Sequence, residues 1–114
     1  MSGGPAPEIS QDVLFGIAQL ALEQVEGVRA TTPPVRVGEI LTGRRAKGIR
    51  IERDGDTVTV DLRVAVPYGV RIPAAASRAQ QAVREAISSM TGLVVGAVVV
   101  TVEAIDLPEG LSRG

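Results

Sequence analysis

The side chains best suited to hold an anion are gathered in a short basic run near the middle of the chain. Arg44, Arg45 and Lys47 lie between two glycines, and residues 36–53 contain six basic and two acidic side chains in a chain of net charge −1. Such a local excess of positive charge could bind phosphate or an acidic protein surface. The glycine spacing lacks the Gly-Lys-Ser/Thr ending of a phosphate-binding loop. A loop whose charges are merely solvated therefore stays open as the alternative.

A further basic side chain, Arg71, stands at the start of a predicted helix. Together with the free amide groups of that helix end, it could bind an anion. The neighbouring residues favour a structural interpretation, in which Gly69 makes a turn and the ring of Tyr68 covers the edge of the core.

The residue types that most often carry catalysis or bind metals are missing. The chain has no Cys and no His, which excludes disulfides, thiolate or imidazole metal sites, and a His general base. Asp54 and Asp56 flank a glycine, but the twelve-residue ligand series of a calcium loop does not follow them. We therefore expect no cofactor, no metal and no enzymatic activity.

Composition indicates one globular domain. The chain has 114 residues, of which 45% are hydrophobic and 22% charged, and Phe15 and Tyr68 are its only aromatic side chains. Near-neutral charge and so few rings argue against nucleic acid as a partner. The start lacks the pattern of a signal peptide, and no apolar stretch is long enough to span a membrane, so we expect a cytoplasmic protein. We expect a disordered segment over 1–8, a single domain over 9–106 and a flexible tail over 107–114.

The first half of the chain predicts a helix followed by a hairpin. Ser10 is typical of a helix N-cap, and apolar residues at helical spacing predict a helix over 11–24. Short strands are expected over 28–30 and 35–40. Residues 49–52 and 58–66 alternate in polarity on either side of Asp54-Gly55, which predicts an antiparallel hairpin.

The second half predicts a helix and a final strand. Pro73 suits a first helical position, Gly92 suits a helix end, and apolar residues recur between them up to Met90. The Val-rich strand 94–103 is apolar enough to be expected inside the sheet rather than at its edge. The order α-β-β-α-β, with an extra short strand after the first helix, predicts an α+β two-layer sandwich. Its small mixed sheet would have both helices on one face.

A two-layer fold leaves the second face of the sheet uncovered. If the even-numbered valines 98, 100 and 102 face the helices, Val99, Thr101 and Ile105 face the other side. Partly apolar surfaces of this kind often mark association sites. We expect self-association or a protein partner on this face.

The order of several short motifs resembles the bacterial alkaline-shock-protein family. These motifs are the run 65–73 (AVPYGVRIP), then Met90-Thr91-Gly92-Leu93 before a Val-rich strand, with Val25-Glu26-Gly27-Val28 and Lys47-Gly48-Ile49 earlier in the chain. The resemblance covers about residues 9–106. It implies a small, non-catalytic cytoplasmic protein linked to envelope stress, in some members held near the membrane by a separate anchoring protein. The family brings no catalytic residues to carry over.

Two functions follow from these features. The first is a scaffold that binds other proteins and forms a homo-oligomer, linked to envelope or alkaline stress through a partner that could be membrane-anchored. The alternative is a nucleic-acid-binding module that uses the basic loop at 44–47. A membrane-inserted protein is not expected.

Overall fold

The described part of the chain forms two helices and a four-stranded sheet. The computed structural model describes residues 8–31 and 48–108. Along the chain the elements are α1 (Gln11–Glu23), β1 (Arg29–Ala30), β2 (Ile49–Asp54), β3 (Thr57–Pro67), α2 (Ile72–Thr91) and β4 (Val94–Asp106). This order confirms the predicted α-β-β-α-β arrangement and its extra short strand. The strand expected over 35–40 lies outside the described residues.

The helix ends follow from local sequence. The hydroxyl oxygen of Ser10 accepts a hydrogen bond from the backbone N–H of Val13, and Asp12 stands in the first turn of α1. Gly92 ends α2 with a left-handed backbone, at φ 76°. Both features confirm the predicted boundaries to within a residue or two.

β3 is the centre of the sheet. It pairs with β2 through an antiparallel hairpin and with β4 in parallel, so the sheet is mixed. β1 also pairs antiparallel with β3, at Val64 and Ala65. The two central residues of the hairpin turn are Gly55 and Asp56, one position later than the sequence suggested, because Asp54 still pairs with Thr57.

β1 and β2 lie one after the other along the same edge of β3. The N–H of Arg63 donates to the carbonyl of Gly48, and the carbonyl of Arg63 accepts from the N–H of Thr31. The N–H and the C=O of one strand residue point to the same edge of the strand, so Gly48 and Thr31 lie on the same edge of β3. Thr31 and Gly48 therefore both lie beside Arg63, at the middle of this edge.

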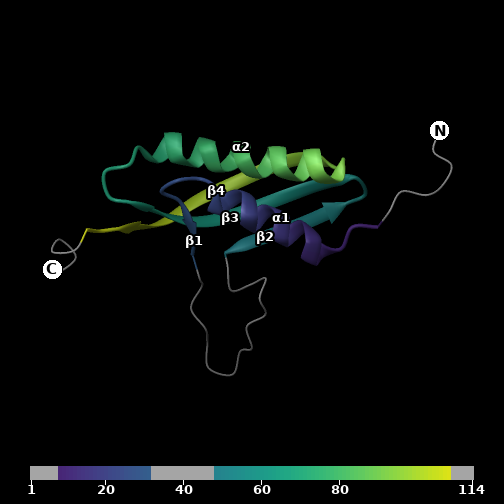
Figure 1. Ribbon diagram of the computed structural model, residues 1–114, viewed down its shortest axis with the longest axis horizontal. Helices are drawn as coiled ribbons and strands as arrows, with labels where there is room; N and C mark the ends of the chain where they lie inside the picture. The colour runs from purple at the N-terminus through teal and green to yellow at the C-terminus, as the bar shows by residue number, and fades with distance from the viewer. Residues whose placement is uncertain (1–7, 32–47, 109–114) are drawn as a thin grey trace, which may run out of the picture.

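Both helices cover one face of the sheet (Figure 1). The core lies between the two layers, and α2 packs against both α1 and β4. Every second residue of β3 contributes its side chain to this core. The largest fully buried side chains of the core are Leu14, Leu22, Leu62, Ile87, Val58, Val60, Val64, Val66 and Val83. The two-layer prediction is confirmed.

Two β-bulges change the phase of β4. The register between β3 and β4 shifts once between Val58 and Thr59 and again between Val64 and Ala65. After the second shift Ile105 pairs with Val66, whose side chain is in the core between sheet and helices. The prediction that Ile105 shares the face of Val99 is therefore wrong, because the extra residue reverses the alternation.

Three further predictions are corrected. Within the described residues β4 pairs only with β3, so it is an edge strand and not an interior one. Met90 is 69% exposed instead of packing on the core face of α2. Tyr68 is 62% exposed, so its ring does not cover the core edge, although Gly69 does make the expected turn at φ 96°.

Among the residues that the structure describes, no helix is both long enough and apolar enough to cross a membrane.

Candidate protein-interaction surface

The sheet face opposite the helices carries polar and charged side chains, several of which form ion pairs. We call it the open face. It is formed by the β3 residues that alternate with the core and by residues beside them on the neighbouring strands, including Arg29, Thr31, Arg50, Glu52, Thr57, Thr59, Asp61, Arg63, Ala65, Ala97, Val99, Thr101, Glu103 and Asp106. Acidic and basic groups are interspersed on it, so it is not a basic patch of the kind that nucleic acid requires.

Arg63 and Glu103 form the central ion pair of the open face. The Nη1 of Arg63 lies 2.6 Å from Oε2 of Glu103. The hydroxyl of Thr31 lies 3.1 Å from the other carboxylate oxygen and 3.2 Å from the carbonyl of Arg63. The hydrogen bonds from Arg63 and then from Thr31 hold the pKa of Glu103 below its usual value, against a smaller opposing effect of burial. These contacts link β3, β4 and Thr31, the residue that follows β1.

A second ion pair closes the end of the face. Nε and Nη2 of Arg29 donate to the two carboxylate oxygens of Asp106 at 2.9 and 2.8 Å. This two-pronged geometry is the stronger kind of Arg–carboxylate contact, and it lowers the pKa of Asp106 mainly through the hydrogen bonds. Ala65, the β3 partner of Arg29, is fully buried although it belongs to the open face. Two hydrogen bonds therefore join the side chains of Arg29 and Asp106 at the surface.

A shallow depression of about 230 Å³ lies elsewhere on the open face. Its lining is polar except for one valine, and consists of Arg50, Glu52, Thr59, Asp61 and Val99. Val99 is 51% exposed. Arg50 and Glu52 are 3.9 Å apart and both mostly exposed, a contact that contributes little to stability. An exposed apolar side chain surrounded by charges of both signs suits recognition of a protein surface.

The structure separates the residues that the sequence singled out. Val99 and Thr101 lie on the open face, and Thr101 is the β4 partner of Arg63. Arg71 is at the N-cap of α2 and its side chain makes no capping hydrogen bond. Arg44, Arg45 and Lys47 lie outside the described residues, so the basic loop stays a prediction.

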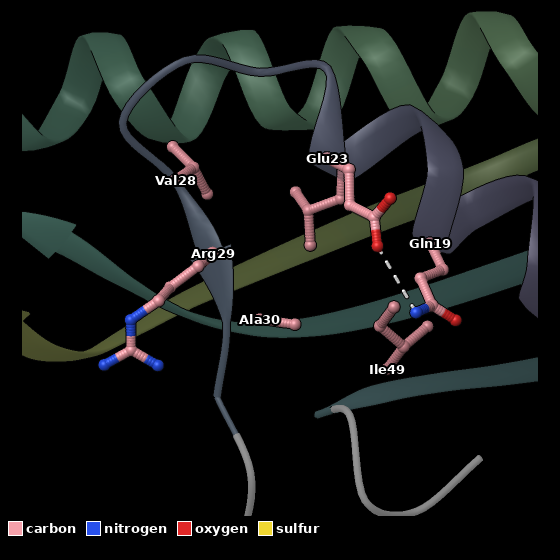
Figure 2. Close-up of a pocket in the computed structure, with 7 residues that line it drawn as sticks. Gln19, Glu23, Val28, Arg29, Ala30 and Ile49 are labelled. Atoms are coloured by element: carbon pink, nitrogen blue, oxygen red, sulfur yellow. Dashed lines mark hydrogen bonds between the residues drawn. The ribbon is translucent and has the colours of Figure 1, made fainter. Parts of the chain in front are cut away.

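A pocket between α1 and β1 escaped the sequence reasoning (Figure 2). It has a volume of about 280 Å³ and is lined by Gln19, Leu22, Glu23, Val28, Arg29, Ala30 and Ile49. Its floor is apolar, since Leu22, Val28 and Ile49 are buried core residues. Nothing in the sequence marks it, because these residues come from three elements and each has an ordinary role in its own element.

The polar side chains of this pocket are not arranged for catalysis. The Nε2 of Gln19 donates to Oε2 of Glu23 at 3.4 Å, and Figure 2 shows Arg29 pointing away from both. Glu23 is the only carboxylate among the described lining residues, so these residues form no acid–base pair. In residues 8–31 and 48–108 no group of three or more acidic side chains is placed to hold a metal ion.

Comparison with protein families gives one match that spans the domain. Residues 6–107 match the model of the family of alkaline shock protein 23, the alkaline-shock-protein family, which is described as having a cell envelope-related function. The match confirms the family that the sequence motifs suggested.

Two relatives have similar sequences. The uncharacterized protein YqhY of Bacillus subtilis (strain 168) is 33% identical over 92 residues, which cover 75% of this chain and 66% of YqhY. The uncharacterized protein Spy1535 of Streptococcus pyogenes serotype M6 is 32% identical over 98 residues, covering 85% of this chain and 76% of that protein. The chain therefore spans about two thirds to three quarters of these relatives.

Solved structures share the fold at low sequence identity. The zinc form of a MamM CTD variant superposes with a TM-score of 0.53 and 16% identity, covering 87% of this chain and 90% of the other. A second MamM CTD variant gives a TM-score of 0.54 and 18% identity, covering 85% of this chain and 100% of the other. At this identity the likeness concerns the fold alone.

Proposed function

Because the chain belongs to the alkaline-shock-protein family, whose described function is related to the cell envelope, we propose that it is a non-catalytic scaffold that acts by binding other proteins. The binding surface in this proposal is the open face of the sheet. The chain works in the cytoplasm and is linked to envelope or alkaline stress through a partner. If that partner has a membrane anchor, it holds the chain near the envelope.

The observation that carries the proposal is the charge pattern of the open face. Glu103 and Asp106 each form an ion pair, with Arg63 and Arg29. The half-exposed Val99 lies in a depression lined by Arg50, Glu52 and Asp61. Side chains that an ion pair already restrains lose less conformational entropy when a partner binds. Charges of both signs favour one orientation of the partner over others. These properties support a specific protein contact.

Self-association is part of the same proposal. Val99 and Thr101 face outward on β4, and β4 is an edge strand in the described sheet. Strand edges of this kind pair readily with other strands. A homo-oligomer would present several open faces at once and so raise the apparent affinity for a clustered partner.

The test compares a change on the open face with a matched change on the helical face. Val99→Glu places a charge on the open face, and Met90→Glu places the same charge on α2, where Met90 is 69% exposed. Each tagged protein is used to capture binding proteins from a solubilised envelope fraction of the source organism. The affinity for each captured protein is then measured with purified components.

We expect one envelope protein to bind the wild type and Met90→Glu equally, and Val99→Glu at least about tenfold more weakly. Equal binding by all three proteins would remove the open face from the proposal. If no protein binds reproducibly and the wild type stays monomeric, the scaffold function itself is wrong. Nuclease-sensitive recovery of RNA would instead favour the nucleic-acid alternative.

A further inference from the structure

The outer edge of β4 is covered along only part of its length. Two side chains of α2 reach this strand: Nη1 of Arg84 donates to the carbonyl of Val95 at 2.8 Å, and Nε2 of Gln80 donates to the carbonyl of Val98 at 3.0 Å. Figure 1 shows α2 running along β4, with the C-terminal end of β4 extending past the start of the helix. In the part of the chain that the structure describes, no side-chain hydrogen bond reaches a β4 backbone group beyond Val98.

Backbone alternation identifies which groups of β4 point outward. The N–H of Val94 and the carbonyl of Asp106 bond to residues next to β3, so these two residues face inward. The carbonyls of Val95 and Val98 point outward to α2, and the bulge between them keeps the two on the same edge. The backbone groups of successive strand residues point to opposite edges. Counting from Val98, the N–H and C=O groups of Val100 and Val102 therefore point outward, and those of Thr101 point to β3.

The sequence of α2 explains why the cover stops there. Positions one and two turns before Gln80 on the same side of the helix are Ala76 and Pro73. Neither side chain can donate a hydrogen bond, and both are too short to reach the edge of the sheet. We call residues 100–102 of β4 the free stretch. It therefore coincides with the small residues at the start of α2.

We propose that a second copy of this chain pairs antiparallel with the free stretch of β4, with the twofold axis at Thr101. The proposal deepens the self-association part of the proposed function and rests on it. In this register Val100 of one copy lies opposite Val102 of the other, and the outward groups of these residues form four backbone hydrogen bonds. The two sheets then join into one continuous sheet with the helices of both copies on the same face.

The sequence around this axis is complementary to itself. Thr101 meets Thr101 of the second copy on the open face, and the half-buried Val100 and Val102 meet each other on the helix side. Threonine pairs and β-branched pairs are favourable across antiparallel strands. Glu103 lies opposite Val99 of the second copy and keeps its own partner Arg63, so no like charges face each other. A twofold contact needs a surface of this kind, which fits itself.

The test places a charge on the twofold axis. Thr101→Lys and Thr101→Glu each set like charges against each other in a homodimer, whereas an equal mixture of the two variants sets opposite charges against each other. Thr59→Lys and Thr59→Glu are the controls, because Thr59 is an exposed threonine of the same face on the central strand. Association is followed by sedimentation velocity from micromolar to millimolar concentration, and amide hydrogen exchange is measured at both ends of that range.

We expect the wild type and both Thr59 variants to dimerise. Each Thr101 variant alone should raise the dimer Kd at least about tenfold, and the mixture should recover the wild-type value. The amides of Val100 and Val102 should become protected as concentration rises. A wild type that stays monomeric throughout would overturn the proposal together with self-association. A dimer that the Thr101 variants leave unchanged, or that protects other amides, would overturn the β4 edge contact and leave association through another surface standing.

Discussion

The Nη1 of Arg63 and the Oε2 of Glu103 are 2.6 Å apart and join the parallel strands β3 and β4 across the open face. The hydrogen bonds to this carboxylate lower its pKa in the folded protein. The folded state therefore binds fewer protons than the unfolded chain. The resulting stabilisation is complete above the unfolded pKa of a glutamate, about 4.3, and is lost as the pH falls through the lower folded value.

The first prediction concerns this pH dependence. Glu103→Gln should lower the Tm at pH 7, and the difference from the wild type should shrink as the pH falls below about 4. Thr31→Val keeps the ion pair but removes one donor to Glu103, so it should show the same trend with a smaller amplitude. Thermal unfolding followed by circular dichroism from about pH 2.5 to 7 measures both. A difference that is constant over the whole range would contradict the role of the carboxylate.

The second prediction concerns the point where β1, β2 and β3 meet. A Cβ at Gly48 would lie 2.6 Å from the carbonyl oxygen of Thr31 and 2.9 Å from that of Arg63, and its φ is +66°. Gly55 has nearly the same φ, +63°, but nothing within 4 Å of the added carbon. Gly55→Ala should therefore cost about 1–2 kcal/mol from backbone strain alone. Gly48→Ala should lower the free energy of unfolding by about 2 kcal/mol more than Gly55→Ala does, because the added methyl group also meets the two carbonyl oxygens.

Urea unfolding of both glycine variants gives the two free energies. Because the φ values match, the difference between the variants isolates the steric contact from the strain. Equal losses would mean that the strands separate enough at Gly48 to admit a methyl group.

The third prediction concerns the packing of α2. Ala79 is fully buried in the core and Ala74 is exposed on the same helix. Ala79→Leu should destabilise the protein by about 1–3 kcal/mol because the core has no room for the larger side chain. Ala74→Leu should change the free energy of unfolding by less than about 0.5 kcal/mol. Similar values for both variants would show that the layer under α2 is loosely packed.

The elements of this fold could be predicted because each has a local signal. The N-cap at Ser10, the glycine at Gly92 and the alternation along β3 each act over a few residues, and the structure confirms them. The two layers followed from the apolar faces of the helices. The family followed from the order of motifs, and the match over residues 6–107 confirms it.

The features that sequence reasoning missed depend on distant pairing. The second bulge of β4 moves Ile105 to the helix side, and no local residue signals that shift. The apolar run of β4 suggested an interior strand, but α2 covers one of its faces and Val99 is exposed on the other. Arg63 and Glu103 are 40 residues apart in the sequence, so only the parallel register brings them together. The basic loop at 44–47 stays a prediction.

The last prediction concerns the part of the β4 edge that α2 covers. Gln80 and Arg84 each donate to an outward carbonyl of β4, at Val98 and Val95. The double variant Gln80→Ala with Arg84→Ala should lose about 1–3 kcal/mol of stability, since a net hydrogen bond contributes about 1 kcal/mol and a charged donor somewhat more. It should also expose the whole outer edge of β4, which favours pairing with other chains in mixed registers.

We therefore expect the double variant to associate beyond the dimer, seen as light scattering that grows with time and concentration. Gln81→Ala, an exposed neighbour on the same helix, is the control and should stay soluble. If the double variant is as stable and soluble as Gln81→Ala, these two side chains do not protect the edge, and the limit of the free stretch at Val98 has to be explained by another contact.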